Sequence, residues 1–498
     1  MANTIEQRGF FWWFNEPHLP AHSKETSIPG LLNITEDGQI TVQIDGALCG
    51  KDEHTDWTKP RSFPATRRIA GLLATPGDYI LLEGLQRTDF SISDESPQTQ
   101  TFTAESCTKR QFPFPDDYEQ GRFIELRVEM TGLEDWLELD SLQVHRQYTD
   151  DDSIRTQVSY REHEINFPAP GGSISIESLT TGTHSLCFLS DRPARKVNFE
   201  QTFYIVFRPD TPADAQHLQY IFTKLEEFLS LLLGSYYRLA WPTFVRKEEP
   251  LDSWITLYSH RGAPAAEQFN RWFSWVPFSR IRSHFGQLFQ TWLIESEAFG
   301  AGFYLYVASL RNPHVYTEDR LFTLASGIEA FHRRWFMESE TSPGIVREKE
   351  RVKRILDLLT EDNPDRKWLC KKLTHAHEPS LETRMLECLR GLPLQFGKSE
   401  LEKFAKACAT RRNDISHEGG PRGDMDYSVF HRETACLAEA LDHLFHALLL
   451  HKIGLQRDVL LETVTRSWVA ERRIKPALAE VGLNIQLPPE IDNRREEG

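Results

Sequence analysis

The hydrophobic pattern of this chain changes its period near residue 212, so one kind of secondary structure cannot form the whole chain. Before this point apolar and polar residues alternate. In FIELRVEM, residues 123–130, the side chains of one face are Ile124, Leu126, Val128 and Met130, as the period of two in a β-strand requires. After residue 212 apolar residues recur every three or four positions, which is the period of an amphipathic helix. The sequence therefore predicts an α+β multidomain protein.

The N-terminal half is predicted to be an antiparallel β-rich domain, sandwich-like or barrel-like. Residues 31–44 contain two short alternating runs around Asp37-Gly38, which predicts a hairpin. Further strands are predicted over 78–85, 123–130, 171–179 and 202–209. No helical period separates these strands, which argues against βαβ units.

The C-terminal half is predicted to be an all-α helical bundle behind an aromatic-rich, mostly helical middle segment. A first helix is expected over 212–234, and the bundle helices over 317–336, 346–359, 380–392, 399–413 and 426–454. Short loops between helices favour antiparallel packing. We therefore predict a β-rich domain over 1–210, a connecting region over 211–312, a helical bundle over 313–470 and a C-terminal tail over 471–498.

The net charge of −16 is concentrated in the N-terminal part of the chain. Residues 1–310 hold 27 Lys and Arg against 42 Asp and Glu, whereas residues 311–498 hold 30 against 31. The acidic part would repel a phosphate backbone, so its expected partners are proteins. The C-terminal part can approach RNA without strong repulsion.

The cysteines and the hydropathy exclude several classes of protein. Seven cysteines occur without a CxxC pair, which argues against a zinc ribbon or a disulfide scaffold and fits a reducing compartment. The first residues lack the basic and long apolar regions of a signal peptide, and no run of about 18 apolar residues exists. We therefore expect a cytoplasmic protein without a membrane partner.

The stretch ATRRNDISHEGG, residues 409–420, is the one place in the sequence where four to six residues separate an arginine from a following histidine. The helix before it has an apolar stripe formed by Leu401, Phe404, Ala405 and Cys408. Continued, this stripe includes Arg412 and Ile415, with Arg411 to its side. An unbroken α-helix would place His417 about 140° around from Arg412. We therefore predict that the helix ends between 413 and 416, with Asn413 as a left-handed cap, so that His417 approaches Arg412. The alternative is a solvated helix end whose cations favour the helix dipole.

A helical bundle that carries Arg-Asn-x-x-x-His resembles the HEPN superfamily of ribonucleases and defence proteins, whose signature is an arginine, four to six residues and a histidine. Arg412 and His417 fit with four intervening residues, and Arg411 fits with five. The segments RGFFWWFNEPH (8–18), IPGLLNITEDGQI (28–40) and GLEDWLEL (132–139) resemble the N-terminal domain of ApeA-type anti-phage HEPN proteins. RLFTLASGIEAFHRRW (320–335), which contains Glu329, resembles the first HEPN helix of that family.

The resemblance implies a metal-independent endoribonuclease without a cofactor. The 2′-hydroxyl of RNA is the nucleophile, so the protein must supply an acid/base and positive charge for the phosphorane. His417 is then the acid/base and Arg412 the phosphate clamp, with Asn413 orienting the phosphate and Glu329 holding Arg412 by an ion pair. The expected RNA-binding residues are Arg411, Arg333 and Arg334. His375 and His377 are interpreted as a surface loop and not as a metal pair, because no cysteine or close acid accompanies them.

The resemblance also implies the partners. Two copies would face each other through the HEPN domain as a homodimer, which gives a composite cleft with two arginines and two histidines. Cleavage of host RNA, with tRNA as the expected target, would halt growth in abortive infection once a phage protein acts as the trigger. The N-terminal domain would sense that trigger or restrain the nuclease. One alternative is a catalytically inactive HEPN binding and dimerisation module that acts through a protein partner. A third reading is a lectin or peptide binder with a helical dimerisation tail.

Overall fold

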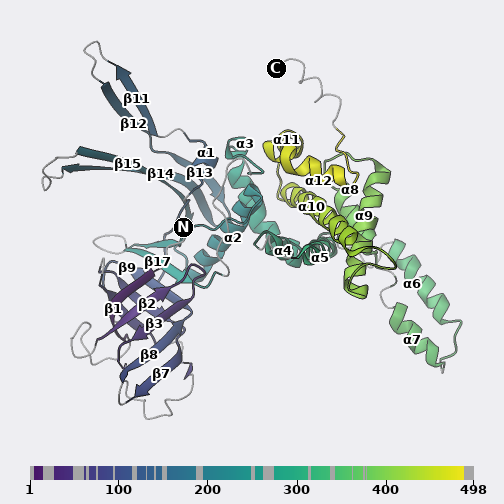
Figure 1. Cartoon of the computed structure of the whole chain (residues 1–498), viewed down its shortest axis with the longest axis horizontal. Helices are drawn as coiled ribbons and strands as arrows, with labels where there is room; N and C mark the ends of the chain where they lie inside the picture. The colour runs from purple at the N-terminus through teal and green to yellow at the C-terminus, as the bar shows by residue number, and fades with distance from the viewer. Residues whose placement is uncertain are drawn as a thin grey trace. The chain divides into compact units, whose positions relative to one another are not determined.

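The computed structural model describes most of the chain in two compact units (Figure 1). The described residues are 5–14, 27–46, 48, 61–62, 67–74, 77–93, 96–114, 121–130, 132–139, 142–148, 154–186, 195–247, 253–261, 274–311, 316–336, 343–361, 363–373, 376 and 378–486. The first unit comprises Met1–Glu227, Tyr237–Arg271 and Ile281–Gln290, and the second comprises Phe228–Tyr236, Trp272–Arg280 and Thr291–Gly498. The domain boundaries at 210, 312 and 470 stay predictions.

The first unit is built on antiparallel strands, which confirms the predicted fold class for this half of the chain. Its strands are β1 (Ile5–Trp13), β2 (Ile28–Ile34), β3 (Ile40–Ile44), β4 (Arg61–Ser62), β5 (Ile69–Leu73), β6 (Tyr79–Glu83), β7 (Gln86–Ser93), β8 (Ser96–Ala104), β9 (Ser106–Arg110), β10 (Glu125–Glu129), β11 (Leu142–Tyr148), β12 (Ile154–Tyr160), β13 (Glu164–Ala169), β14 (Gly172–Leu186), β15 (Arg195–Pro209), β16 (Thr243–Arg246) and β17 (Ser253–Ser259), with the short helix α1 (Glu134–Leu137). Among the described residues, the main sheet has the order β13-β14-β15-β10-β16-β17-β9-β6-β5-β1-β2-β3-β8-β7-β4, and β11 pairs with β12 separately.

The strand predictions made from alternation are confirmed. β2 and β3 form the hairpin expected at Asp37-Gly38, with Ile34 opposite Ile40 and with Gly38 at a φ of 79°. In β10 the burial alternates, and Leu126 and Val128 are buried as predicted. β14 and β15 are longer than the predicted strands and pair along their whole length.

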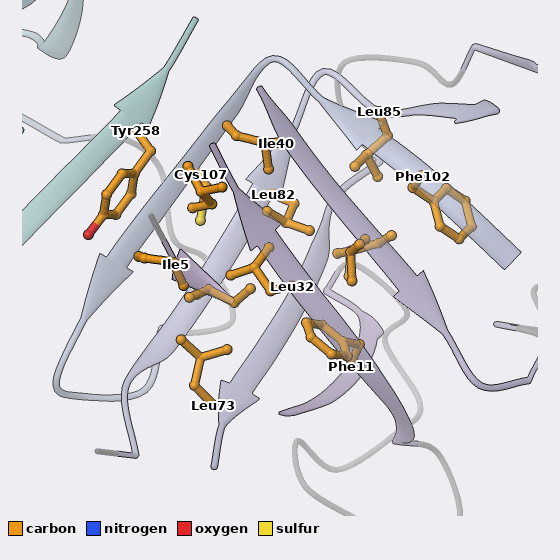
Figure 2. Packing of buried hydrophobic residues seen from close by; sticks show 14 of the residues in the cluster. Ile5, Phe11, Leu32, Ile40, Leu73, Leu82, Leu85, Phe102, Cys107 and Tyr258 are labelled. Carbon is orange, nitrogen blue, oxygen red and sulfur yellow. The ribbon is translucent and has the colours of Figure 1, made fainter. Parts of the chain in front are cut away.

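A large apolar cluster of the β-rich unit lies on the inward faces of β1, β2, β3, β5, β6, β8 and β9 (Figure 2). Phe11 is fully buried in it, because neighbouring strands contribute glycines where its ring lies. A Cβ at Gly30 would be 3.0 Å from the ring of Phe11, and a Cβ at Gly71 would be 2.7 Å from it. Both glycines therefore leave the space that the ring fills. Phe10, the preceding residue, points the other way and is 50% exposed.

The second unit is helical, as the change of period predicted. The helices after the first strands are α2 (Ala215–Leu233), α3 (Phe278–Ile281), α4 (Phe285–Arg311), α5 (Thr317–Trp335), α6 (Pro343–Leu356), α7 (Pro364–Leu373), α8 (Leu381–Arg390), α9 (Lys398–Asn413), the π-helix η2 (Asp414–Glu418), α10 (Tyr427–Lys452), α11 (Arg457–Thr465), the π-helix η3 (Ala470–Ile474) and α12 (Lys475–Glu480). α4 has a kink at Gly300, and α2 and α4 each contribute residues to both units. α7, α11 and α12 were not predicted individually. The chain beyond 471, predicted as a tail, is helical as far as Glu480, with Ala477 and Leu478 buried.

The helical bundle packs around α10. This helix contacts α5, α8, α9, α11 and α12, and its buried face is almost wholly apolar. Aromatic rings join the helices, as where Phe331 of α5 stacks on Trp335 and meets Phe445 of α10 edge-on. The predicted long C-terminal helix is thus the central element of the bundle, because its apolar residues cover more than one face.

His446 lies inside this bundle and is buried. Its Nδ1 is 2.6 Å from the hydroxyl of Tyr306, and its Nε2 is 2.7 Å from the carbonyl oxygen of Leu231. The imidazole also stacks on Trp275, with ring centroids 4.0 Å apart. Both nitrogens have partners that suit the neutral imidazole, with Nε2 donating and Nδ1 accepting. Burial lowers the pKa of His446 to about 4.

Stability is therefore expected to fall on acidification between pH 6.5 and about 4. The unfolded state binds a proton to His446 in this window, whereas the folded state excludes it, so stability rises with pH. From pH 7.5 to pH 5 the loss from this group is about 2 kcal/mol. Urea unfolding at both pH values, followed by helical circular dichroism, measures it. The variant His446→Gln removes the titration, so its pH dependence should be weaker by that amount; parallel pH dependences would contradict the assignment.

Candidate functional site

The arginine–histidine motif lies where α9 changes from an α-helix into a π-helix. The α-helix ends at Asn413, within the predicted range, but the chain stays helical through η2 to Glu418. Asn413 keeps right-handed helical dihedrals, so the predicted left-handed cap at this residue was wrong. Gly419 provides the left-handed cap with a φ of 71°, and its N–H donates to the carbonyl of Asp414.

The π-helix changes the angular relation between the two residues of the motif. Its hydrogen bonds join residues five apart, so each turn takes more residues than an α-turn. His417 is the fifth residue after Arg412. The π-turn thus brings His417 back toward the side of the helix that carries Arg412, and reduces the separation of about 140° that a continued α-helix imposes. π-Turns within helices occur often at functional sites.

Arg412 is half-buried and held from two sides. Its Nη2 is 3.8 Å from Oε2 of Glu329 in α5, which is the ion pair predicted between these two residues. Its Nη1 donates to Oδ1 of Asn413 at 3.3 Å, and its guanidinium lies 5.3 Å from the ring centre of Phe322. Among the described residues its buried Nε has no hydrogen-bond partner. The guanidinium is thus oriented by these neighbours, and because its Nε is buried, a further acceptor can be met only by the Nη groups.

The side chain of His417 is exposed, whereas the turn that carries it is held by an ion pair of Asp414. Within the part of the chain that the structure describes, no hydrogen bond or ion pair joins its imidazole to Arg412 or to another residue. The buried Asp414 of the same turn pairs with Nε of Arg422 at 2.5 Å. An exposed imidazole on an anchored turn is accessible to a substrate from solvent.

Of the two adjacent arginines, Arg411 is buried and Arg412 is not. The prediction that Arg412 continues the apolar stripe of this helix was therefore wrong. The predicted apolar positions before it are buried, but the buried face continues through Arg411 and Asp414 and not through Arg412. Nη2 of Arg411 pairs with Glu433 of α10 at 2.5 Å, and the guanidinium lies 4.2 Å from the ring centre of Phe430. Arg411 therefore joins α9 to α10; its predicted contact with RNA stays a prediction.

The two other arginines predicted to bind RNA lie at the end of α5. Arg333 donates to Glu378 at 2.6 Å and to Glu329 at 3.1 Å, so Glu329 lies between Arg333 and Arg412. Arg334 donates to the carbonyl oxygen of Glu297 at 3.2 Å. Both side chains are exposed. The structure thus groups Arg412, Glu329 and Arg333 in one charged cluster, with Arg334 on the same helix end.

A cavity of about 840 Å³ borders the motif at Arg411 and Asp414, and the sequence analysis did not predict it. Its lining comes from α9, α10 and the end of α12 and includes Arg411, Asp414 and Cys436, but neither Arg412 nor His417. Cys436 donates to Glu480 at 2.9 Å, and this carboxylate raises the thiol pKa to about 11. The thiol is therefore not a nucleophile near neutral pH.

The titratable residues of the described chain offer no metal site. No group of three or more His, Cys, Asp or Glu side chains lies close enough together there to hold an ion. His375 and His377, interpreted above as a loop, lie outside the described residues. Among the described helices, none is long and apolar enough to cross a membrane.

Comparison with family models gives the class of protein first. The model described as Apea-like HEPN matches residues 322–459, which include most of α5 and all of α6, α7, α8, α9, η2 and α10, and hence every predicted site residue. The second unit thus contains a HEPN domain. HEPN domains are generally related to ribonucleases, and they commonly dimerise and bind RNA.

A second model identifies the family. The model for ApeA N-terminal domain 1 matches residues 6–292, more than half of the chain. The chain therefore belongs to the family of ApeA-type HEPN proteins, as the sequence motifs had indicated. The two domains fit an anti-phage defence HEPN protein. Comparisons with curated proteins and with solved structures returned no match.

Proposed function

We propose that this protein is a metal-independent endoribonuclease of anti-phage defence, with Arg412 and His417 as its catalytic residues. The observation that supports this most directly is the π-helix at Asp414–Glu418. It begins two residues after Arg412, turns His417 toward the same side of the helix and leaves the imidazole exposed. A solvated helix end would not need an arginine anchored by a carboxylate from another helix.

The proposed chemistry uses the nucleophile of the substrate. The 2′-oxygen attacks the adjacent phosphorus while His417 accepts the 2′-hydroxyl proton. Arg412 donates to the phosphate oxygens, where negative charge develops, and Asn413 and Glu329 orient the guanidinium. The bond to the 5′-oxygen breaks and this oxygen takes a proton. The products are a 2′,3′-cyclic phosphate and a 5′-hydroxyl.

The second proton-transfer group is proposed to come from a second copy of the chain. Each copy offers one histidine of this motif, whereas cleavage needs both a base and an acid. Two HEPN domains in a homodimer would place a second His417 and a second Arg412 in the same cleft. Host tRNA is the proposed substrate and the cytoplasm the proposed compartment. The β-rich unit is proposed to sense a phage protein or to restrain the nuclease.

The test is incubation of the purified chain with tRNA in EDTA, beside the variants Arg412→Ala and His417→Ala. Fragments with 2′,3′-cyclic phosphate ends, absent with both variants, support the proposal. If a phage-activated wild-type protein leaves the tRNA intact, the protein is instead a HEPN binding module that acts through a partner. Cleavage that persists in both variants would assign the activity to other residues.

A further inference from the structure

The helices α6 and α7 form a hairpin that lies between α5 and α8 in the chain (Figure 1). Its described residues form no apolar core. None of its described side chains, from residue 346 to residue 373, is buried. The hairpin is closed by Arg366, whose Nη1 donates to the carbonyl oxygen of Leu359 at 2.7 Å. Isolated helices of 14 and 10 residues are marginal in water, so such a hairpin gains stability from a partner.

Large apolar side chains of the hairpin face solvent. Leu358 is 83% exposed and Trp368 is 60% exposed. Val346 and Ile355 are exposed as well. An exposed indole on a helix is a surface on which a base can stack.

The hairpin is basic within an acidic chain. Residues 343–373 hold nine Lys and Arg against six Asp and Glu, whereas the whole chain has a net charge of −16. Arg347, Arg351 and Arg354 follow each other at intervals of four and three, so they line one face of α6. Among the described cations of the hairpin, those that are exposed and make no ion pair are Arg347, Lys353, Arg354, Lys367, Lys371 and Lys372.

The arrangement of these groups suits RNA better than a protein surface. Lys371 and Lys372 follow Trp368 by one helical turn, so the indole and two ammonium groups share one side of α7. Stacking on an aromatic ring beside cations that meet phosphates is the common mode of binding to unpaired RNA. A protein interface would have to desolvate six cations, whereas phosphates neutralise them and release counterions.

The base of the hairpin is linked to the proposed catalytic pair by a series of ion pairs. Arg412 meets Glu329, Glu329 meets Arg333, and Arg333 meets Glu378, which lies just after α7. Glu378 in turn pairs with the buried Arg384 of α8 at 3.1 Å. Glu378 is the fifth residue after the end of α7, so these contacts connect that end of the hairpin to Arg412.

We propose that the α6–α7 hairpin is the arm that holds substrate RNA beside the Arg412–His417 pair, with Trp368 stacking on a base and the exposed cations contacting phosphates. The inference rests on the proposed function, since it assigns the binding surface for the same substrate. It goes beyond the predicted RNA contacts at Arg411, Arg333 and Arg334, which lie outside the hairpin.

Binding measured without cleavage tests this proposal separately from the nuclease. The full-length chain carrying His417→Ala is titrated with labelled tRNA in EDTA, with and without Arg347→Ala, Arg354→Ala and Lys371→Ala together.

The matched control removes three exposed cations elsewhere in the helical unit, by Lys398→Ala, Arg457→Ala and Arg472→Ala. We expect Kd to rise at least tenfold in the hairpin variant and to change by less than about threefold in the control. The slope of log Kd against log salt should fall by about two to three, because three phosphate contacts are lost.

Trp368→Ala by itself should weaken binding about fivefold or more without changing that slope, because stacking carries no charge. Equal tRNA affinity in the hairpin variant and its parent, or an equal loss in the control, overturns the proposal. So does a change in oligomeric state of the hairpin variant at unchanged tRNA affinity, which would make the hairpin an interface between copies. Cleavage of tRNA by the chain with intact His417 is measured separately. Failure of the proposed nuclease activity and failure of the proposed binding role of the hairpin therefore give different results.

Discussion

Replacing His417 by alanine is expected to lower the rate of tRNA cleavage about 10²- to 10⁴-fold, because the variant loses the group that accepts the 2′-hydroxyl proton. Since the imidazole is exposed and has no partner among the described residues, its removal should leave stability unchanged. Single-turnover cleavage in EDTA with saturating protein measures the chemical step apart from binding. His431→Ala is the matched control, since it removes another exposed imidazole of the same unit.

Arg412 is expected to show a complementary pattern. Arg412→Ala should lower the single-turnover rate about 10²- to 10³-fold, as for other donors that stabilise charge in a transition state. Arg412→Lys should recover only part of this loss, because an ammonium provides a point charge without the planar fork. If His431→Ala reduces the rate as strongly as His417→Ala, or if Arg412→Ala leaves it unchanged, the proposed assignment of these residues is wrong.

Replacing Phe11 by alanine is expected to destabilise the β-rich unit by about 3–5 kcal/mol. The ring is fully buried over Gly30 and Gly71, and neither neighbour has a side chain that can fill the cavity left behind. Phe10→Ala, at the adjacent exposed position, should cost less than about 1 kcal/mol. Urea unfolding of the full chain, followed by tryptophan fluorescence, measures both. Similar losses for the two variants would contradict the packing described for β1.

Patterns within short segments predicted much of the fold. The alternation in residues 123–130 predicted β10, and Asp37-Gly38 predicted the turn between β2 and β3. Within the aromatic run from Phe10 to Phe14, Phe10 is exposed whereas Phe11 and Trp13 are buried, as the alternation of a strand requires. Such predictions succeed because strand and helix periods are set by local geometry.

The candidate site was predicted only in part. The spacing of Arg412 and His417 and the ion pair with Glu329 came from the motif, and the pair is present in the structure. The sequence predicted Arg412 on the buried face of α9, whereas in the structure Arg411 is the buried residue. Both positions lie within the wide stripe that a helix can bury, and the choice depends on Glu433 and Phe430 of α10.

The amino-acid sequence by itself determined the division into a β-rich and a helical part, the family, and the residues of the motif. Each of these follows from the spacing of residue types along the chain. The tertiary structure alone decided which arginine is buried, that the motif continues as a π-helix, and that His446 lies in the core. These features depend on contacts between residues far apart in the chain, as where Leu231 of α2 accepts a hydrogen bond from His446 of α10. The periodicity of a short segment does not predict such contacts.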